Sequence, residues 1–330
     1  MTPEFSMVPV TILTGFLGSG KTTLLNRILS EQHGHKIAVI ENEFGEAGVD
    51  NDILIQGGEA QIVEMNNGCV CCTVRGDLTR ILGDLKDRRD AGAIGFDRVI
   101  IETTGMADPG PVAQTFFLDE AIGNYYLLDS VITLVDAMHG RQQLEDFREA
   151  QEQVGFADRI LLSKTDLVSE GQAEQLRRRL VQINPRAPIH NVHFGQMPIA
   201  EVLDIRGFNL NAALEIDPEF LEEDEHEHAS EVHSFVFRSG RPFDGALLEE
   251  FLSGLVQVYG KDMLRYKGVV YLQDNAHRVV FQGVHMLMGG DLGKAWGDDE
   301  TRQSTIVFIG RDLPEDGFIK GLEQCLVRSE

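Results

Sequence analysis

Short apolar runs alternate with longer amphipathic stretches from Val8 to about Phe194. The runs that predict strands are Val8 to Thr14, Lys36 to Glu41, Asp97 to Glu102, Ser130 to Asp136, Arg159 to Ser163 and Pro188 to His193. The stretches that predict helices are Thr22 to Ser30, Leu78 to Asp90, Arg141 to Val154 and Gly171 to Ile183. Several runs are apolar at nearly every position, which is typical of central strands covered on both faces. The pattern therefore predicts an α/β fold with a doubly wound, mostly parallel sheet.

The composition changes between Glu215 and Glu231, where Asp, Glu and His dominate and Pro218 interrupts the segment. Such a segment is too charged to bury, and we interpret it as a linker. Beyond it the pattern predicts strands at Val232 to Arg238, Arg265 to Leu272, Arg278 to Met286 and Ser304 to Gly310, and helices at Ala246 to Tyr259 and Glu315 to Val327. We therefore expect a first domain over 7–214, an acidic linker over 215–231, and a smaller α+β domain over 232–330 with helices on one face of an antiparallel sheet.

A chain of 330 residues, 42% of them hydrophobic, can form one large core and a second, smaller one. Its formal net charge of -24 repels the phosphate backbone of nucleic acids and the surface of anionic lipid. No apolar run approaches the roughly 20 residues that a membrane-spanning helix needs. We therefore expect a cytoplasmic protein that binds neither nucleic acid nor membrane.

The segment from Gly15 to Thr22 matches the phosphate-binding pattern G-x-x-x-x-G-K-[ST], and it lies between a predicted strand and a predicted helix. Backbone N–H groups of such a loop surround the phosphates, the lysine neutralises their charge, and the threonine hydroxyl binds Mg²⁺. The alternative is an ordinary glycine-rich turn. The residues expected to contact the nucleotide here are Gly15, Gly18, Ser19, Gly20, Lys21, Thr22 and Thr23.

A second element of this site is Glu102-Thr103-Thr104-Gly105, which follows an apolar run. A carboxylate at the end of a central strand faces the phosphate crevice of a doubly wound sheet and can hold a water of Mg²⁺. The N–H of Gly105 can approach the γ-phosphate, so this segment can distinguish GTP from GDP. A glutamate before a turn is common, so the assignment depends on the neighbouring P-loop. We expect Lys21, Thr22 and Glu102 to be the catalytic residues.

A base-binding motif is predicted at Ser163-Lys164-Thr165-Asp166, which follows another apolar run. The Asp166 carboxylate can accept hydrogen bonds from the ring N–H and the exocyclic amine of guanine, and adenine offers neither donor. The stem of Lys164 can lie along the base. The alternative is a turn that caps a helix. Guanine nucleotides are therefore the expected ligands.

A metal site is predicted around Cys69, Cys71 and Cys72, because three potential thiolates lie in one short segment. Thiolates favour Zn²⁺ or Cu(I) over Mg²⁺ or Ca²⁺. A tetrahedral ion usually has four ligands, and the carboxylates Glu41, Glu43 and Glu46 follow the second predicted strand, where many GTPases place a switch loop. The alternatives are buried, inert cysteines or a redox-sensing pair.

These motifs, in this order, resemble the CobW-type metallochaperone GTPases of the SIMIBI class, and in particular their YjiA-like branch. The resemblance covers nearly the whole chain and includes Met106 to Pro111, Leu264 to Gly268, and Trp296 before the predicted strand at Ser304. It implies a slow intrinsic GTPase, self-association linked to nucleotide or metal, and a C-terminal domain that contacts a client metalloprotein.

The resemblance also implies a set of ligands. The metal site would combine Cys71 with Glu41 and Glu46, with Cys69 and Cys72 as possible further ligands, and Asp50 would be a switch-loop ligand of Mg²⁺. The metal would be Zn²⁺, although Co²⁺ and Ni²⁺ suit the same donors. The leading hypothesis is a GTP-hydrolysing metallochaperone that transfers zinc to a client protein. The alternatives are a zinc-buffering or storage protein with a structural nucleotide site, and a P-loop small-molecule kinase.

Overall fold

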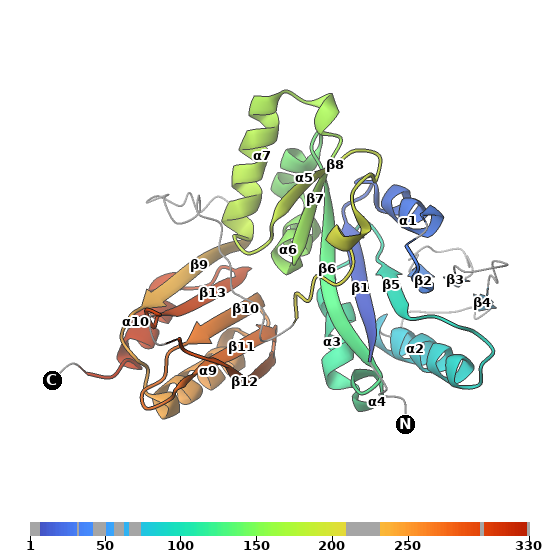
Figure 1. The fold of residues 1–330 in the computed structure, drawn as a ribbon. Coiled ribbons are helices and arrows are strands. Elements are labelled where there is room, and N and C mark those ends of the chain that lie inside the picture. Colours follow the sequence, from blue (N-terminus) through green and yellow to red (C-terminus); the bar gives the residue numbers. More distant parts are fainter. Residues whose placement is uncertain are drawn as a thin grey trace. The chain divides into compact units, whose positions relative to one another are not determined.

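The computed structural model describes residues 7–31, 33–41, 51–55, 63–65, 74–208, 232–297 and 300–328, with the backbone alone for 41, 51–55, 63–65 and 74–75. The chain forms two compact units (Figure 1). One comprises Met1–Arg177 and Pro188–Gly207, and the other comprises Arg178–Ala187 and Phe208–Glu330. Among the helices that the structure describes, none has both the length and the apolar character needed to cross a bilayer.

The first unit is built on one large sheet with the strand order β4-β3-β2-β5-β1-β6-β7-β8. Its strands are β1 Val8–Gly15, β2 Ile37–Glu41, β3 Asn51–Ile55, β4 Val63–Met65, β5 Arg98–Glu102, β6 Tyr126–Asp136, β7 Arg159–Ser163 and β8 Ile189–Val192. Strands β2, β5, β1, β6, β7 and β8 are neighbours in this order and run parallel. Strands β3 and β4 add an antiparallel edge. Parallel strands end at one edge of the sheet, so the residues that follow β1, β5, β6 and β7 lie close together there.

Helices cover both faces of this sheet. They are α1 Lys21–Ser30, α2 Val74–Asp90, α3 Gly110–Leu118, α4 Glu120–Gly123, α5 Gly140–Asp146, α6 Arg148–Phe156 and α7 Glu170–Ile183, with 3₁₀ turns η1 Thr165–Leu167 and η2 Ile199–Glu201. Helix α1 packs Leu24 and Ile28 against Leu134 of β6. The neighbouring Thr133 donates to the backbone of α6, and successive side chains of a strand point to opposite faces. The central strand β1 is therefore buried between the two layers, as a doubly wound sheet requires.

The second unit has an antiparallel sheet with the order β12-β11-β10-β13-β9. Its elements are β9 Val232–Ser239, α9 Gly245–Tyr259, β10 Met263–Val270, β11 His277–Val284, β12 Leu287–Ala295, β13 Ser304–Arg311 and α10 Glu315–Gln324. Phe235, Phe308 and Phe318 pack in mutual contact, with ring centroids 5.0 to 5.4 Å apart. Residues of α9 and α10 join the same apolar cluster, so both helices cover one face of the sheet.

The predicted fold class is confirmed, and the main differences are local. The single helix expected over Arg141 to Val154 is wrong, because Phe147 is extended (φ -129°, ψ 119°) between α5 and α6. Its ring packs on Phe16, with centroids 4.7 Å apart. The last helix ends at Gln324 rather than Val327, since Leu326 forms a bridge to Phe243. The predicted linker 215–231 lies outside the described residues, and the domain limits drawn from it stay a prediction.

Among the helices and strands that the structure describes, five were not anticipated: α3, α4, β3, β4 and β12; the 3₁₀ turns η1 and η2 were not anticipated either. Strand β12 contains Gly289, Gly290 and Gly293, which weaken strand formation, and it exists because it pairs in register with β11. Strand β6 also begins earlier than expected, at Tyr126, and continues through the polar pair Asp129 and Ser130. Both polar residues are buried, and Asp129 accepts hydrogen bonds from the backbone of Ile205 and Arg206.

We expect Phe308→Ala to lower the free energy of unfolding of the second unit by about 3–5 kcal/mol, because its ring is 1% exposed and the neighbouring rings cannot fill the cavity. Val258→Ala is the control, since Val258 is 70% exposed and its truncation should change the free energy by less than about 0.5 kcal/mol. Urea unfolding followed by circular dichroism measures both. Equal midpoints for the two variants would contradict the proposed core.

Candidate functional site

The loop that joins β1 to α1 has the backbone of a phosphate-binding loop. A Cβ on Gly15 would lie 2.4 Å from the carbonyl oxygen of Leu134, so no side chain fits there. Gly20 has φ 103°, a left-handed conformation that favours glycine, and it precedes the first residue of α1. The helix N-terminus therefore opens directly onto the loop, where its N–H groups and partial positive charge favour an anion.

Lys21 lies over this loop. Its Nζ donates to the carbonyl oxygens of Gly15, at 2.7 Å, and Phe16, at 3.3 Å. Burial lowers the pKa of Lys21, and the Glu102 carboxylate opposes part of that shift. The ammonium group is thus held at the loop that the sequence predicts to bind phosphate.

The two residues predicted to serve Mg²⁺ lie together. The Thr22 hydroxyl donates to Oε1 of Glu102 at 3.0 Å. Glu102 ends β5 and pairs in register with Leu13 of β1, and the next residue, Thr103, donates to the Thr14 hydroxyl at 2.8 Å. A hydroxyl and a carboxylate are hard oxygen donors, so this pair suits Mg²⁺.

Gly105 packs directly against the P-loop. A Cβ on Gly105 would lie 2.5 Å from Cδ2 and 2.7 Å from the backbone nitrogen of Leu17. The segment is also held by Gln153 of α6, whose Nε2 donates to the carbonyl oxygens of Gly105 and Ala107 at 3.2 and 3.0 Å. Gln153 was not predicted, because a glutamine in an amphipathic helix gives no signal of such a contact.

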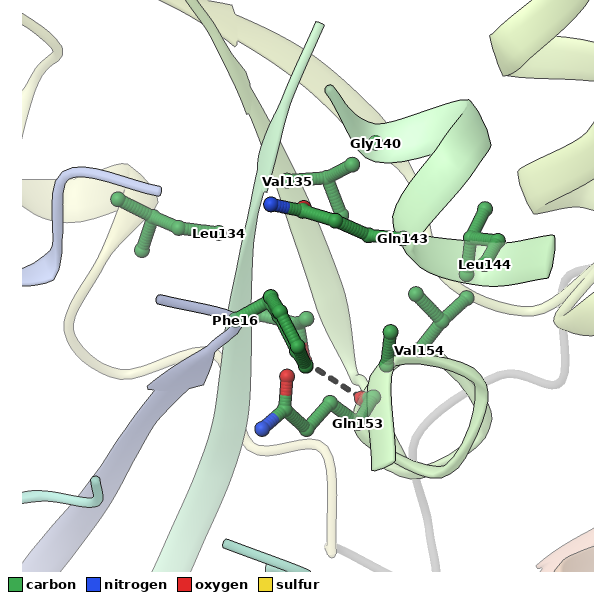
Figure 2. Close-up of a pocket in the computed structure, with 10 residues that line it drawn as sticks. Phe16, Leu134, Val135, Gly140, Gln143, Leu144, Gln153 and Val154 are labelled. Atoms are coloured by element: carbon green, nitrogen blue, oxygen red, sulfur yellow. Dashed lines mark hydrogen bonds between the residues drawn. The ribbon is translucent and has the colours of Figure 1, made fainter. Parts of the chain in front are cut away.

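A small cavity is lined by Phe16 of the P-loop together with residues of β6, α5 and α6. Figure 2 shows the Phe16 ring beside Gln153 and Val154 of α6, with Gln143 and Leu144 of α5 around it. The dashed line there is the hydrogen bond from Thr133 Oγ1 to the carbonyl oxygen of Gln153, at 2.7 Å. The lining is largely apolar, so we interpret the cavity as a packing gap beneath the Phe16 ring rather than as a ligand site.

The predicted base-binding motif is joined to the P-loop by two side chains. Ser163 Oγ donates to the carbonyl oxygen of Ser19 at 2.7 Å, and Lys164 Nζ donates to that of Gly18 at 2.8 Å. The Lys164 stem therefore spans from η1 to the P-loop. Asp166 lies in η1 with its side chain 47% exposed, available to a ligand.

Asp136, at the end of β6, is a site residue that was not predicted. It is buried, and it accepts hydrogen bonds from Lys164 Nζ at 2.7 Å, His139 Nδ1 at 3.0 Å and the Met138 N–H at 2.8 Å. Burial raises the pKa of Asp136, but these bonds together outweigh that effect, so its pKa lies below the ordinary value. Its place at the end of an apolar run, like that of Glu102, is the signal that could have identified it.

The predicted metal ligands are described only in part. Glu41 is the last residue of β2 and pairs in register with Glu102 of β5. The other predicted ligands, Glu46, Asp50, Cys69, Cys71 and Cys72, lie outside the described residues. Within the described ranges, no three His, Cys, Asp or Glu side chains are grouped so that they could hold a metal ion.

Two family models match the chain. Residues 9–191 match the CobW/HypB/UreG nucleotide-binding domain, and residues 232–326 match the cobalamin synthesis protein cobW C-terminal domain. The zinc chaperone YjiA of Escherichia coli is 46% identical, over 94% of this chain and 96% of its own length. The zinc-regulated GTPase metalloprotein activator 1 of Dictyostelium discoideum is 33% identical, over 98% of this chain and 80% of its own.

Solved structures agree with these matches. The crystal structure of the zinc-bound YjiA GTPase of E. coli matches with a TM-score of 0.82 and 43% identity, over 98% of this chain and 100% of that chain. A zinc-bound triple mutant of YjiA, with one glutamate and two cysteines replaced by alanine, also matches with a TM-score of 0.82, at 41% identity and the same coverage.

Asp136→Asn tests the contact between β6 and the base-binding motif. We expect GDP binding to weaken about 10-fold, because Lys164 loses a charged hydrogen-bond partner worth about 1.5 kcal/mol. The Asp136 pKa lies below its ordinary value, so the ion pair contributes fully above about pH 4 and is lost only as the pH falls through the lowered pKa. Calorimetric titration with GDP at neutral pH measures the change.

The matched control for that variant is Glu145→Gln, which removes an exposed carboxylate paired with Arg141 on α5. GDP affinity should not change in the control, because exposed pairs contribute little. If Asp136→Asn bound GDP as tightly as the control, the ion pair would have no part in the base site.

Proposed function

Since the chain belongs to the CobW/HypB/UreG nucleotide-binding family and carries the CobW-type C-terminal domain, we propose that it is a GTPase that binds zinc and delivers it to a client protein. One observation carries the coupling between the two activities. Glu41, from which the predicted metal loop continues, pairs in register with Glu102, the carboxylate that contacts the P-loop threonine. The predicted metal ligands and the phosphate site therefore begin on adjacent strands.

For hydrolysis, the described residues provide charge neutralisation and positioning. Lys21 supplies a buried ammonium group at the loop, and Thr22 with Glu102 would hold Mg²⁺, which when bound neutralises charge on the β- and γ-phosphates. Asp50 would complete this site from the switch loop. In the described part of the chain we identify no side chain that orients the attacking water, so we expect slow turnover, below about 1 per second without a partner.

Guanine selectivity would come from Asp166, with Ser163 and Lys164 fixing the motif to the P-loop. A carboxylate only accepts hydrogen bonds at neutral pH, so it matches the ring N–H and the amine of guanine. The hydrogen bonds of Ser163 and Lys164 to P-loop carbonyls keep the base site at a fixed distance from the phosphate site. Excess GTP should therefore displace a labelled guanine nucleotide, and ATP at the same concentration should not.

The zinc site would combine thiolates of Cys69, Cys71 and Cys72 with carboxylates of Glu41 and Glu46. These donors suit a soft, tetrahedral ion. The solved E. coli variant has one glutamate and two cysteines replaced, the same residue types as in this proposed set, and it still contains zinc. Residual zinc binding is therefore expected when single ligands are removed, and the informative quantity is how affinity depends on the nucleotide.

The nucleotide would control the zinc site through the strand ends. A γ-phosphate near Gly105 would change the segment that begins at Glu102, and Glu41, from which the predicted metal loop continues, pairs in register with Glu102. GTP would then shape the zinc site, and hydrolysis would release the ion to the client. A cytoplasmic location, a client metalloprotein and self-association linked to nucleotide or metal belong to the same proposal.

Lys21→Ala is expected to lower kcat for GTP hydrolysis at least about 100-fold and to weaken nucleotide binding, because charge on the transferred phosphoryl group loses its fixed cation. Phosphate release measures the first effect, and calorimetry measures the second. Lys320→Ala is the control, since Lys320 is 71% exposed on α10. Unchanged turnover in the Lys21 variant would remove this loop from the mechanism.

Zinc titration in the presence of GDP or a non-hydrolysable GTP analogue tests the coupling. We expect the two zinc affinities to differ about 5- to 150-fold, and Cys71→Ser to abolish most of this difference. Cys325→Ser is the control, because that thiol is buried in the second unit and bonds to the Gly321 carbonyl. Equal affinities with both nucleotides would leave a zinc-buffering protein with a nucleotide site that only stabilises the fold.

A further inference from the structure

The chain turns sharply after β8. The backbone N–H of Gln196 donates to the carbonyl oxygen of His193 at 2.8 Å, and these two residues form an antiparallel bridge. The two residues between them, Phe194 and Gly195, have φ of 46° and 73°. Two successive positive φ values define a type I′ turn, in which glycine, asparagine and aspartate are the usual residues. A phenylalanine at its first central position is strained.

The Phe194 side chain obtains little packing in return. It is 74% exposed, the highest value among the exposed large hydrophobic residues that the structure describes. Its ring contacts the His193 ring edge to face, with centroids 4.5 Å apart and planes at 76°. A residue with a strained backbone and an exposed aromatic ring contributes little to folding, so these features indicate that Phe194 contacts a ligand.

The turn is fixed beside the base-binding motif. His193 Nδ1 lies 3.4 Å from Oδ1 of Asp166, the carboxylate expected to read guanine. On its other side, Gly195 is buried against α1, where an added Cβ would lie 3.1 Å from Leu24 Cα and 3.2 Å from the carbonyl oxygen of Thr23. Asp166 belongs to the predicted base-binding motif, and α1 begins at the P-loop. The Phe194 ring, which contacts His193, therefore lies at the end of the nucleotide site where the base is expected.

We propose that the Phe194 ring stacks on the base of the bound nucleotide and that the His193 ring holds it in position. This contact would add to the one made by the Lys164 stem. Asp166 reads the edge of guanine through hydrogen bonds, and it leaves the faces of the ring without a partner. An aromatic side chain suits such a face, because offset or edge contacts between π systems are favourable and the ring excludes water from the base. This inference rests on the proposed guanine-nucleotide function and extends it.

The test uses Phe194→Asn, which relieves the backbone strain at this position and removes the aromatic ring. Asparagine tolerates positive φ, so the thermal unfolding temperature should stay equal or rise. GDP should bind about 5- to 150-fold more weakly in calorimetric titration, because one base–aromatic contact is lost. Phe194→Tyr should retain GDP affinity within about 2-fold, since a phenol ring stacks equally well. Inorganic tripolyphosphate, which has no base, should bind both variants and the unaltered protein alike.

Phe117→Ala is the matched control, because Phe117 is an exposed phenylalanine on α3, and its loss should leave GDP affinity unchanged. Unchanged GDP affinity in Phe194→Asn would overturn the inference. An equal loss for GDP and tripolyphosphate would also overturn it, because the turn would then act through the P-loop. If the unaltered protein bound tripolyphosphate but showed no preference for GDP over ADP, the guanine-specific function would fail. The stacking inference would then be decided separately, because a stacked ring contacts either base: it would be overturned if Phe194→Asn bound both nucleotides as tightly as the unaltered protein.

Discussion

A P-loop turns its N–H groups inward to face phosphate, and its carbonyl oxygens must then find donors elsewhere. In this protein backbone N–H groups bond to the carbonyls of Phe16 and Gly20, and side chains bond to three others. The side chains of Lys21, Lys164 and Ser163 donate hydrogen bonds to the carbonyl oxygens of Gly15, Gly18 and Ser19, respectively. Two of these donors belong to the base-binding motif, so the requirement for hydrogen bonds in one loop also sets the position of the other.

The parallel sheet extends this arrangement along its carboxyl edge. Register pairs Glu41 with Glu102 on one side of β1 and Asp136 with Ser163 on the other, so polar residues from four strands lie at the carboxyl edge of the sheet. Each has a different role: Glu102 contacts the P-loop threonine, Asp136 holds the base-motif lysine, and Glu41 leads toward the predicted zinc ligands. A zinc site that begins at Glu41, as proposed, would start on the strand next to Glu102, the carboxylate that contacts the P-loop threonine.

Features carried by local patterns could be predicted, and features made by long-range contacts could not. The P-loop, the Glu102 segment and the Ser163 motif each follow an apolar run and consist of a few consecutive residues. By contrast, Gln153 acts on Gly105, 48 positions away, through a bond that no local spacing shows. The break at Phe147 has the same origin, because the ring leaves the helical pattern to pack on Phe16. Strand β12 formed against its own glycine content because β11 provides a partner.

That strand also affects how the molecule meets other chains. Strand β12 is an outer strand of its sheet, and outer strands expose backbone N–H and C=O groups to which a foreign strand can add. Here Asp291 and Lys294 place charges along the strand, which also carries the exposed apolar side chains of Met288 and Leu292. The charges that interrupt the apolar pattern of β12 therefore also disfavour the addition of a foreign strand at this edge.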